Sequence, residues 1–524
     1  MRNSTSDASG SFLPPLSKAF LRAHASTLDS YRLVDKSFPT KVLQFGEGGF
    51  LRGFADWMIH RMNAQGLFNG KVVIIQPIPS GTIETLNRQE GLYTLIRRGI
   101  VQGKPVEEVE LITSVSHGIN PYTDYDAFLD CASLPELRFI ISNTTEAGIH
   151  LDEEDSFDAA PPRSFPGKLT RFLWERFHRM GGALDRGFII LPCELIDRNG
   201  DTLKRIVRTL AEGWTQDPQF LQWIEEANTF CNTLVDGIMT GYPRDEVDSL
   251  QAKLGYRDDL LDTGELFRLW VIEGPENLRI EFPLDQVGIN VVWTKDMTLY
   301  RTRKVRILNG IHTMSAPIAI AIGIETVREA LLDTVFFGFI RKTLYEEIIP
   351  VLKMPRGKLE NYAESVLERF ANPFIKHQWS SIALNSCAKF RARVLPTILD
   401  YQEKFSRVPK GLSFSFAALL SYYRGTIDPE TSQTIKDDPW VIEFFRSLWS
   451  QALRIGISER SSSANTSLRH VNPAQLSSLV QQALSNSSLW GVDVSSPSLV
   501  KEVSQHLERI LQKGMYRSLQ QILQ

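Results

Sequence analysis

The stretch Val42-Leu43-Gln44-Phe45-Gly46-Glu47-Gly48-Gly49-Phe50-Leu51-Arg52 decides the fold of this chain. Its first four residues form a short apolar run that is typical of a buried β-strand, and glycines follow directly. A dinucleotide-binding fold needs a tight turn there, a backbone that can approach a pyrophosphate, and a helix N-terminus facing the phosphates. Gly46 and Gly48 fit the first two glycine positions of that fingerprint, whereas Leu51 occupies the third. The turn indicates a nucleotide site, although two glycines at a strand end are often only a turn.

The pattern continues outward as an α/β arrangement. Phe50, Phe54, Met58 and Met62 recur at a spacing of four, which predicts a helix that ends near Gly66. Short apolar runs rich in branched residues then follow at helix-sized intervals, as expected for a parallel sheet that is buried on both faces. These runs are residues 72–75, 139–141 and 188–191, with 270–272 and 291–293 as further strand candidates. The sequence thus predicts an α/β fold with an N-terminal Rossmann-type domain.

The texture of the sequence changes near residue 300. Long helical patterns dominate beyond it, over residues 330–352, 359–370 and 498–523. We therefore expect a loose N-terminal arm with one short helix over 1–37, a Rossmann-type dinucleotide-binding domain over 38–297, and a mostly helical domain over 298–524. The Ser-rich residues 458–468 are predicted to form a flexible loop in the helical domain.

Composition limits the classes of partner. The 524 residues carry a net charge of -3, which gives no electrostatic reason to expect nucleic acid or an anionic membrane. The N-terminus has a polar Ser/Thr/Asp/Gly stretch and no apolar signal segment, and no window reaches the length of a membrane span. The cysteines are far apart, in no metal-like spacing: Cys131, Cys193, Cys231 and Cys387. We expect a cytoplasmic protein, either a monomer or a small homo-oligomer.

A second run, Lys304-Val305-Arg306-Ile307-Leu308-Asn309-Gly310-Ile311-His312, carries a candidate catalytic group. Reduction of a ketone by hydride transfer makes an alkoxide, which must be stabilised and protonated. A lysine can supply both charge and proton, and an amide and an imidazole can donate hydrogen bonds to the same oxygen. On a regular helix Lys304, Asn309 and His312 would lie within an arc of roughly 140°. For an arbitrary sequence, a surface lysine and a structural Asn and His would be the commoner explanation.

The chain resembles the mannitol dehydrogenase family of long-chain polyol-type dehydrogenases from about residue 41 to its C-terminal region. The matching segments are residues 44–52, 142–148, 192–197, 241–245, the lysine run and 372–378. The resemblance implies NAD(H) as cofactor, no metal, Lys304 as acid/base, and Asn309 and His312 as the pair that binds the oxyanion. It also implies a cofactor site made by Gly46, Gly48, Gly49, Phe50, Arg52, Asn143, Thr145 and Glu146.

The match is best to the branch of the family that reduces keto-hexuronates, because several positions depart from the polyol enzymes. Leu195, His377 and Ser381 replace polar or charged residues of those enzymes, and Arg301 replaces a glutamate associated with proton passage. These changes suit a pocket for an anionic sugar, whose carboxylate needs a cation. We expect reversible reduction of tagaturonate to altronate with NADH. The residues expected to face this small sugar-acid substrate are Glu194, Asp236, Lys376, His377, Lys389 and Arg391.

Several alternatives stay open. Fructuronate carries the same carboxylate and ketone as tagaturonate, and a polyol 2-dehydrogenase or a keto-uronate epimerase with retained NAD would use the same hydride site. The pair Tyr300 and Lys304 has the spacing of short-chain dehydrogenases, but the glycine turn lacks that group's spacing. A zinc enzyme lacks a ligand cluster, and a nucleotide sensor would not need the catalytic trio. Gln76-Pro77 stands where an acid should hold the adenosine ribose, so charge does not decide between NAD and NADP.

Overall fold

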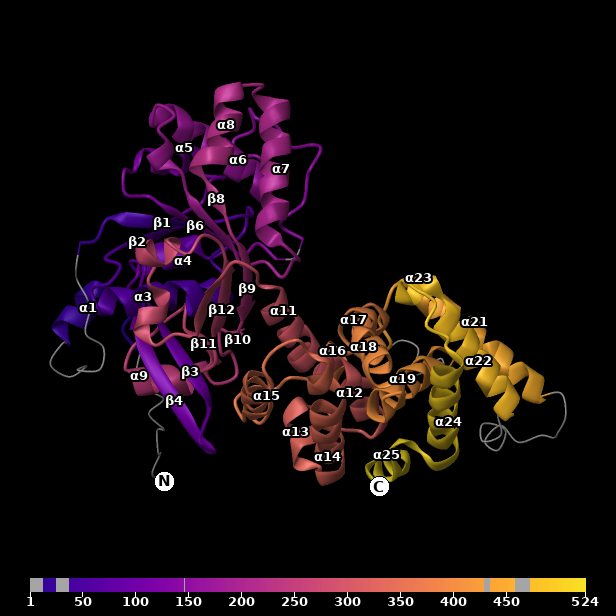
Figure 1. Ribbon diagram of the computed structural model, residues 1–524. Coiled ribbons are helices and arrows are strands. Elements are labelled where there is room, and N and C mark those ends of the chain that lie inside the picture. Colours follow the sequence, from indigo (N-terminus) through magenta and orange to yellow (C-terminus); the bar gives the residue numbers. More distant parts are fainter. Residues whose placement is uncertain (1–12, 25–36, 146, 428–433, 458–471) are drawn as a thin grey trace, which may run out of the picture. The chain divides into compact units, whose positions relative to one another are not determined.

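The computed structural model describes residues 13–24, 37–145, 147–427, 434–457 and 472–524. The chain divides into two compact units, Met1–Met297 and Thr298–Gln524 (Figure 1). The loop predicted over residues 458–468 lies outside the described residues. No helix of the described parts is long and apolar enough to cross a membrane. Within those same parts, no group of three or more His, Cys, Asp or Glu side chains could hold a metal ion.

A six-stranded parallel sheet organises the first unit, with the order β5-β2-β1-β6-β7-β8. The chain winds outward from β1 in both directions, which is the arrangement of a Rossmann fold and confirms the predicted fold class. The switch in direction falls between β1 and β6, so the glycine turn after β1 lies where such folds bind their ligands. The strands are β1 (Thr40–Phe45), β2 (Lys71–Ile75), β5 (Val115–Ile119), β6 (Phe139–Ser142), β7 (Ile189–Pro192) and β8 (Thr229–Phe230).

Side chains of successive strand residues alternate between two apolar layers. Val42 belongs to one core cluster with Phe54 and Met58, and its neighbour Leu43 belongs to the other with Phe172. Both faces of the sheet are therefore buried, which explains why its four central strands are mainly apolar. Figure 1 shows α6, α7 and α8 gathered on one side of the sheet. The helical elements of this unit are α1 (Lys18–Ala23), α2 (Gly49–Leu51), η1 (Arg52–Asp56), α3 (Trp57–Ala64), α4 (Ile83–Arg88), α5 (Tyr125–Asp130), η2 (Cys131–Ser133), α6 (Phe165–Arg179), η3 (Leu184–Arg186), α7 (Asn199–Trp214), α8 (Pro218–Ala227), α9 (Val247–Leu254), α10 (Leu278–Glu281) and η4 (Leu284–Val287).

Two smaller sheets complete the first unit. One has the order β10-β11-β3-β4 and contains a long hairpin whose turn, at Gln102 and Gly103, takes positive φ angles of 51° and 76°. The other has the order β13-β12-β9, so residues 270–272 and 291–293 are strands, but not of the main sheet. Their strands are β3 (Tyr93–Val101), β4 (Lys104–Ile112), β9 (Asn232–Asp236), β10 (Met239–Gly241), β11 (Asp262–Glu265), β12 (Leu269–Glu273) and β13 (Val291–Thr294).

Part of the segment expected as a loose arm is packed. Leu16, just before α1, and Leu21, within it, are buried in a small apolar cluster with Tyr256. The amide of Leu16 also donates a hydrogen bond to the carbonyl of Arg257, at 2.8 Å. The remaining residues of the arm up to 36 lie outside the described residues, apart from those around α1.

The described part of the second unit contains helices and no strands. Its first elements, α11 (Thr298–Lys304), η5 (Val305–Asn309) and α12 (Gly310–Ala321), follow one another without a break, and η5 is a π-helical turn. The others are α13 (Val327–Leu332), α14 (Thr334–Thr343), η6 (Leu344–Ile348), η7 (Ile349–Val351), α15 (Arg356–Phe370), α16 (Trp379–Ile382), α17 (Ser386–Arg393), α18 (Leu395–Phe405), α19 (Lys410–Tyr423), η8 (Arg424–Ile427), α21 (Pro439–Ile457), α22 (Pro473–Ser485), α23 (Ser487–Trp490), α24 (Pro497–Lys513) and α25 (Met515–Leu523).

Candidate functional site

The glycine turn after β1 has the shape that a dinucleotide requires. Gly46 has a φ of 120°, and a Cβ on it would lie 2.9 Å from the carbonyl oxygen of Asn143, so only glycine fits. Gly48 is the N-cap of the helix, and a Cβ there would meet nothing within 4 Å. Open space thus lies directly above free backbone N–H groups at a helix start, which is where a pyrophosphate can bind. This geometry fits the cofactor.

Contacts with neighbouring residues hold the remaining residues of the turn in place. Gly49 leaves room for the carboxylate of Asp262, because a Cβ there would lie 3.0 Å from its Oδ1. Phe50 stacks on Phe54 at 5.0 Å between ring centroids. The guanidinium of Arg52, only 7% exposed, donates to the carbonyls of Glu47 at 3.1 Å and Leu260 at 2.5 Å. Arg52 therefore stabilises the turn by binding its backbone, and its contact with the cofactor stays a prediction.

The loop after β6 lies beside the glycine turn, and Glu194 organises it. The Glu194 carboxylate accepts hydrogen bonds from the amide and hydroxyl of Thr144, both at 2.9 Å, and from the hydroxyl of Ser142 at 3.0 Å. It is 2% exposed, and burial raises its pKa. Asn143 donates to the carbonyl of Cys193 at 3.3 Å, and Thr145 takes a φ of 72°. Both oxygens of Glu194 are thus used to join the ends of β6 and β7.

Two further predicted residues of the first unit are located less fully. Asp236 is the last residue of β9 and is 5% exposed. Glu146 lies outside the described residues. Their assignments to substrate and cofactor stay predictions.

A cavity of about 820 Å³ opens along β2 and β5. Its wall includes Gln76, Pro79 and Gly81 after β2, and Ile119 and Asn120 at the end of β5. Both groups lie at the carboxyl ends of their strands, the edge where open α/β sheets bind ligands. A volume of this size is in the range of small-molecule sites. Sequence reasoning did not find this cavity, because the loop that forms it carries no motif.

In the second unit, the π-turn changes how the predicted catalytic trio is spaced. Lys304 ends α11, Asn309 ends η5, and His312 lies in the first turn of α12. Residues five apart are bonded in a π-turn, so Lys304 and Asn309 lie closer to one line along the helix than the predicted arc for a regular α-helix. Such turns occur often at functional sites. The arc between Lys304 and Asn309 is therefore smaller than the roughly 140° expected for a regular α-helix.

His312 lies in a buried aromatic enclosure. Its ring stacks on Phe370 at 4.3 Å and meets His377 edge-on at 4.8 Å between centroids. The side chain is 6% exposed, and its Nε2 has no hydrogen-bond partner among the described residues. Burial lowers the pKa of His312 well below its ordinary value, and the positive charges of Arg369, Arg393 and Lys389 lower it further. The pKa of the neighbouring His377 is itself lowered by burial and by Lys389. The His312 imidazole is therefore neutral at physiological pH.

The structure gathers some of the predicted cations and leaves others apart. His377 and Lys389 act on His312, and Lys389 donates to the carbonyl of Ile382 at 2.9 Å. Lys376 is exposed, and Arg391 is also exposed and lies against Gly491, whose Cβ would be 2.7 Å from its Nη2.

Arg369 and Arg393 join the cations around His312, although the sequence did not single them out. Only weak features of the sequence could have identified these two arginines. Arg393 lies four residues after Lys389 on α17, so the two share one helix face, and Arg369 directly precedes Phe370. The carbonyl of Arg393 also approaches Gly310, 3.4 Å from the position of a Cβ there.

Comparisons with known proteins agree over most of the chain. The model of the mannitol dehydrogenase Rossmann domain matches residues 40–285, and that of the mannitol dehydrogenase C-terminal domain matches residues 296–511. An altronate oxidoreductase of Shigella flexneri is 45% identical over 493 residues, covering 93% of this chain and 98% of its own. One from Yersinia enterocolitica is 44% identical over 491 residues, with the same coverage.

Solved structures share the fold. The mannitol 2-dehydrogenase of Pseudomonas fluorescens, in a ternary complex with NAD and D-mannitol, has a TM-score of 0.68 at 20% identity, covering 97% of this chain and 99% of its own. A substrate-free D-sorbitol dehydrogenase has a TM-score of 0.71 at 23% identity, covering 92% and 95%. Together with the glycine turn and the family models, these matches show that the chain is an NAD-dependent oxidoreductase of CH–OH groups and belongs to the mannitol dehydrogenase family.

Proposed function

We propose that this protein reduces tagaturonate to altronate with NADH, reversibly. The observation that carries the proposal is the neutral His312, with an unpartnered Nε2, among the cations of Arg369, Arg393 and Lys389. A keto-hexuronate offers both a carbonyl oxygen for a hydrogen-bond donor and a carboxylate for cations. The relatives named altronate oxidoreductase support the same substrate.

The proposed chemistry requires a proton donor and two hydrogen-bond donors at the substrate oxygen. The bound nicotinamide supplies the hydride that adds to the ketone carbon. Lys304 gives a proton to the alkoxide that forms, while the side-chain amide of Asn309 and the imidazole of His312 donate hydrogen bonds to it. Since His312 is neutral, it can donate one N–H without adding a positive charge. In the reverse reaction the Lys304 amine takes the proton from the alcohol.

The substrate carboxylate is proposed to bind Arg393, Arg369 and Lys389, with His377 beside them. Guanidinium groups match a carboxylate in two parallel hydrogen bonds, which a neutral polyol cannot use. The other predicted contacts, at Asp236, Glu194, Lys376 and Arg391, remain part of the proposal only as secondary contributors. On the cofactor side, the proposal keeps Asn143, Thr145 and Glu146 next to the glycine turn.

The test is a substrate panel. Tagaturonate, fructuronate and fructose are each offered with NADH and with NADPH, and turnover is followed at the nicotinamide absorbance. Best turnover of tagaturonate with NADH is expected. Best turnover of fructuronate would move the assignment to the epimeric uronate, and best turnover of fructose would refute a uronate substrate.

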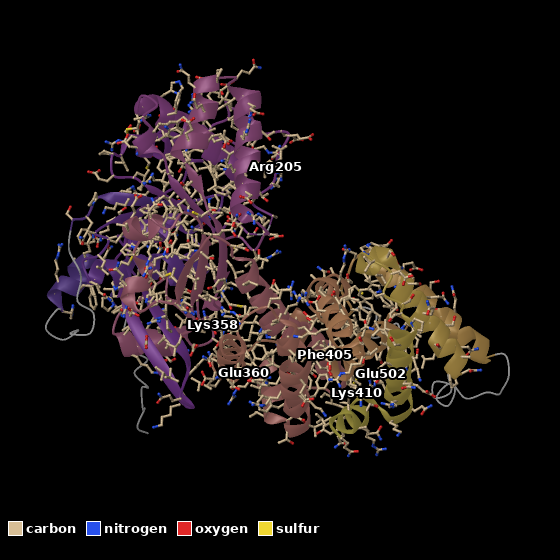
Figure 2. All side chains as sticks on the ribbon, viewed as in Figure 1. Arg205, Lys358, Glu360, Phe405, Lys410 and Glu502 are labelled. Atoms are coloured by element: carbon tan, nitrogen blue, oxygen red, sulfur yellow. The ribbon has the colours of Figure 1, made fainter. Side chains whose placement is uncertain are left out.

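The catalytic trio has its own test. Lys304→Ala should abolish turnover, whereas Tyr300→Phe should keep most of it; the opposite pair of results would favour a short-chain type of mechanism. Lys358→Gln serves as a control, because this exposed lysine lies on α15 with Arg369 (Figure 2). Net oxidation of NADH by tagaturonate separates a reductase from an epimerase that regenerates its cofactor.

The setting proposed for the enzyme follows from its charge and composition. A net charge of -3 favours a small-molecule substrate over nucleic acid or a membrane as partner. We propose a cytoplasmic enzyme that works as a monomer or a small homo-oligomer, and size-exclusion chromatography with light scattering measures which of the two it is.

A further inference from the structure

The end of β2 lacks the acidic residue that usually holds an adenosine ribose, and Gln76 stands there instead. Gln76 is 3% exposed, and its Nε2 donates to the carbonyls of Ile78 at 2.9 Å and Pro79 at 3.1 Å. These two bonds fix the orientation of the amide, because a flipped amide would place its oxygen against two carbonyl oxygens. The Oε1 of Gln76 is therefore held away from them as a hydrogen-bond acceptor.

A second acceptor reaches the same point from the glycine turn. A Cβ on Gly81 would overlap with Oε1 of Glu47 and would lie 2.5 Å from Oε1 of Gln76. The two oxygens thus converge beside Gly81, which leaves room for them because it has no side chain. Gln76 and Gly81 also line the 820 Å³ cavity, so this point belongs to its wall.

Two acceptors that face one point need hydrogen-bond donors between them. Glu47 is partly buried, and this burial raises its pKa, while backbone amides, including that of Thr82, and the charge of Arg52 act in the opposite direction. A ribose carries neighbouring 2′- and 3′-hydroxyls, which are two donors at the spacing of a diol. A 2′-phosphate offers only acceptors and negative charge at that place.

We propose that Glu47 and Gln76 together accept hydrogen bonds from the adenosine ribose diol, and that this pair makes the enzyme select NAD(H) over NADP(H). Glu47, a residue of the glycine turn, thereby takes the role of the acid that is missing after β2. The inference rests on the glycine turn binding NAD(H), and it is independent of which sugar acid is reduced.

Direct binding tests this proposal without turnover. The fluorescence of NADH and of NADPH is titrated against the wild-type protein and against Glu47→Gln, which removes the charge and keeps the shape. The wild type should bind NADH at least tenfold more tightly than NADPH, and Glu47→Gln should shrink that ratio at least tenfold. Equal wild-type affinities for the two cofactors, or an unchanged ratio in the variant, would overturn the proposal.

A matched control and a second variant separate this pair from general electrostatics. Glu226→Gln makes the same change of charge at an exposed acid of α8, which does not line this cavity, and should leave the ratio unchanged. Gly81→Ala should displace both acceptors and weaken NADH binding at least fivefold while the melting temperature stays near that of the wild type. If Glu226→Gln shifts the ratio as much as Glu47→Gln, or if Gly81→Ala binds NADH normally, the ribose site is not at Glu47 and Gln76.

Discussion

The buried carboxyl group of Asp56, at the end of η1 after the glycine turn, makes the stability of the first unit depend on pH. Asp56 is 0% exposed, and its Oδ2 accepts hydrogen bonds from Gln44 at 3.3 Å and Tyr93 at 3.4 Å. Its Oδ1 has no partner among the described residues. Burial is the largest influence and raises the pKa of Asp56 to about 7. Replacement by asparagine keeps the shape and removes the charge.

The magnitude follows from linkage. An unfolded aspartate has a pKa of about 3.9, so the folded state binds this proton more tightly by about three pKa units. A raised acid pKa favours the folded state at low pH, and its cost grows as pH rises toward the folded pKa and then levels off. Between pH 6 and pH 8 that cost increases by about 1.4 kcal/mol. Asp56→Asn removes it, so the gain in stability should be larger at pH 8 by about this amount.

Thermal unfolding at pH 6 and pH 8 measures this difference. A change of about 1.4 kcal/mol corresponds to a shift of roughly 2 °C for a unit of this size. Asp262, whose pKa is raised to about 6, also titrates here, so the variant is compared with the wild type at each pH. Asp126→Asn, at an exposed acid of α5, is the control. A gain that is equal at both pH values, or a greater loss at pH 8, would refute the reasoning.

Three further predictions concern binding and turnover. Gly46→Ala should cost about 1–3 kcal/mol of stability and most NADH affinity, because its Cβ would press on the Asn143 carbonyl; calorimetry and NADH titration measure both, and normal binding would contradict it. Glu194→Ala leaves the Thr144 amide and hydroxyl without their acceptor, so kcat should fall while the second unit's melting is unchanged; an unaltered kcat would show that the loop is held otherwise. Arg393→Gln should raise KM for tagaturonate about 10–100-fold, with fructose turnover unaffected; equal effects on both substrates would indicate a purely structural role.

The four central strands of the main sheet could be predicted because they are buried on both faces, whereas its edge strands β5 and β8 were missed because neither is an apolar run. Residues 42–45, 72–75, 139–141 and 188–191 are continuous apolar runs, and each lies within or overlaps a strand of that sheet. The β3–β4 hairpin was missed, because β4 alternates with acidic residues and one side of it is exposed, which gives no continuous run. Its pairing with β11, far along the chain, is a tertiary feature that no local pattern contains.

Two long helices predicted in the second unit are interrupted, and both interruptions have a local cause. The pattern over 330–352 breaks at Asp333, whose side chain caps α14 by accepting from the amides of Val335 and Phe336. The pattern over 498–523 breaks at Gly514, which has a φ of 84°. Apolar periodicity continued across both breaks, so periodicity alone predicted one helix where a cap or a glycine starts another.

Some residues of the candidate site could likewise be predicted from a local pattern, whereas others depend on tertiary packing. Lys304, Asn309 and His312 were chosen because their local run matches the motif of the family, and their catalytic roles stay a prediction. The choice among cations could not be made in this way, because helix packing decides which of them approach His312: Arg393 does so, and its neighbour Arg391 turns toward Gly491.

The π-turn of η5 has a consequence for how this helix could change. A π-turn contains one residue more than an α-helical turn, so it offsets the register of everything before it from everything after it. If the same residues formed an ordinary α-helical turn, Lys304 would rotate by roughly 100° relative to His312. The apolar side of α12, with Ile311 and Met314 in the interior, would keep its packing. The proposed chemistry of this helix therefore depends on a single inserted residue as much as on the identity of its lysine.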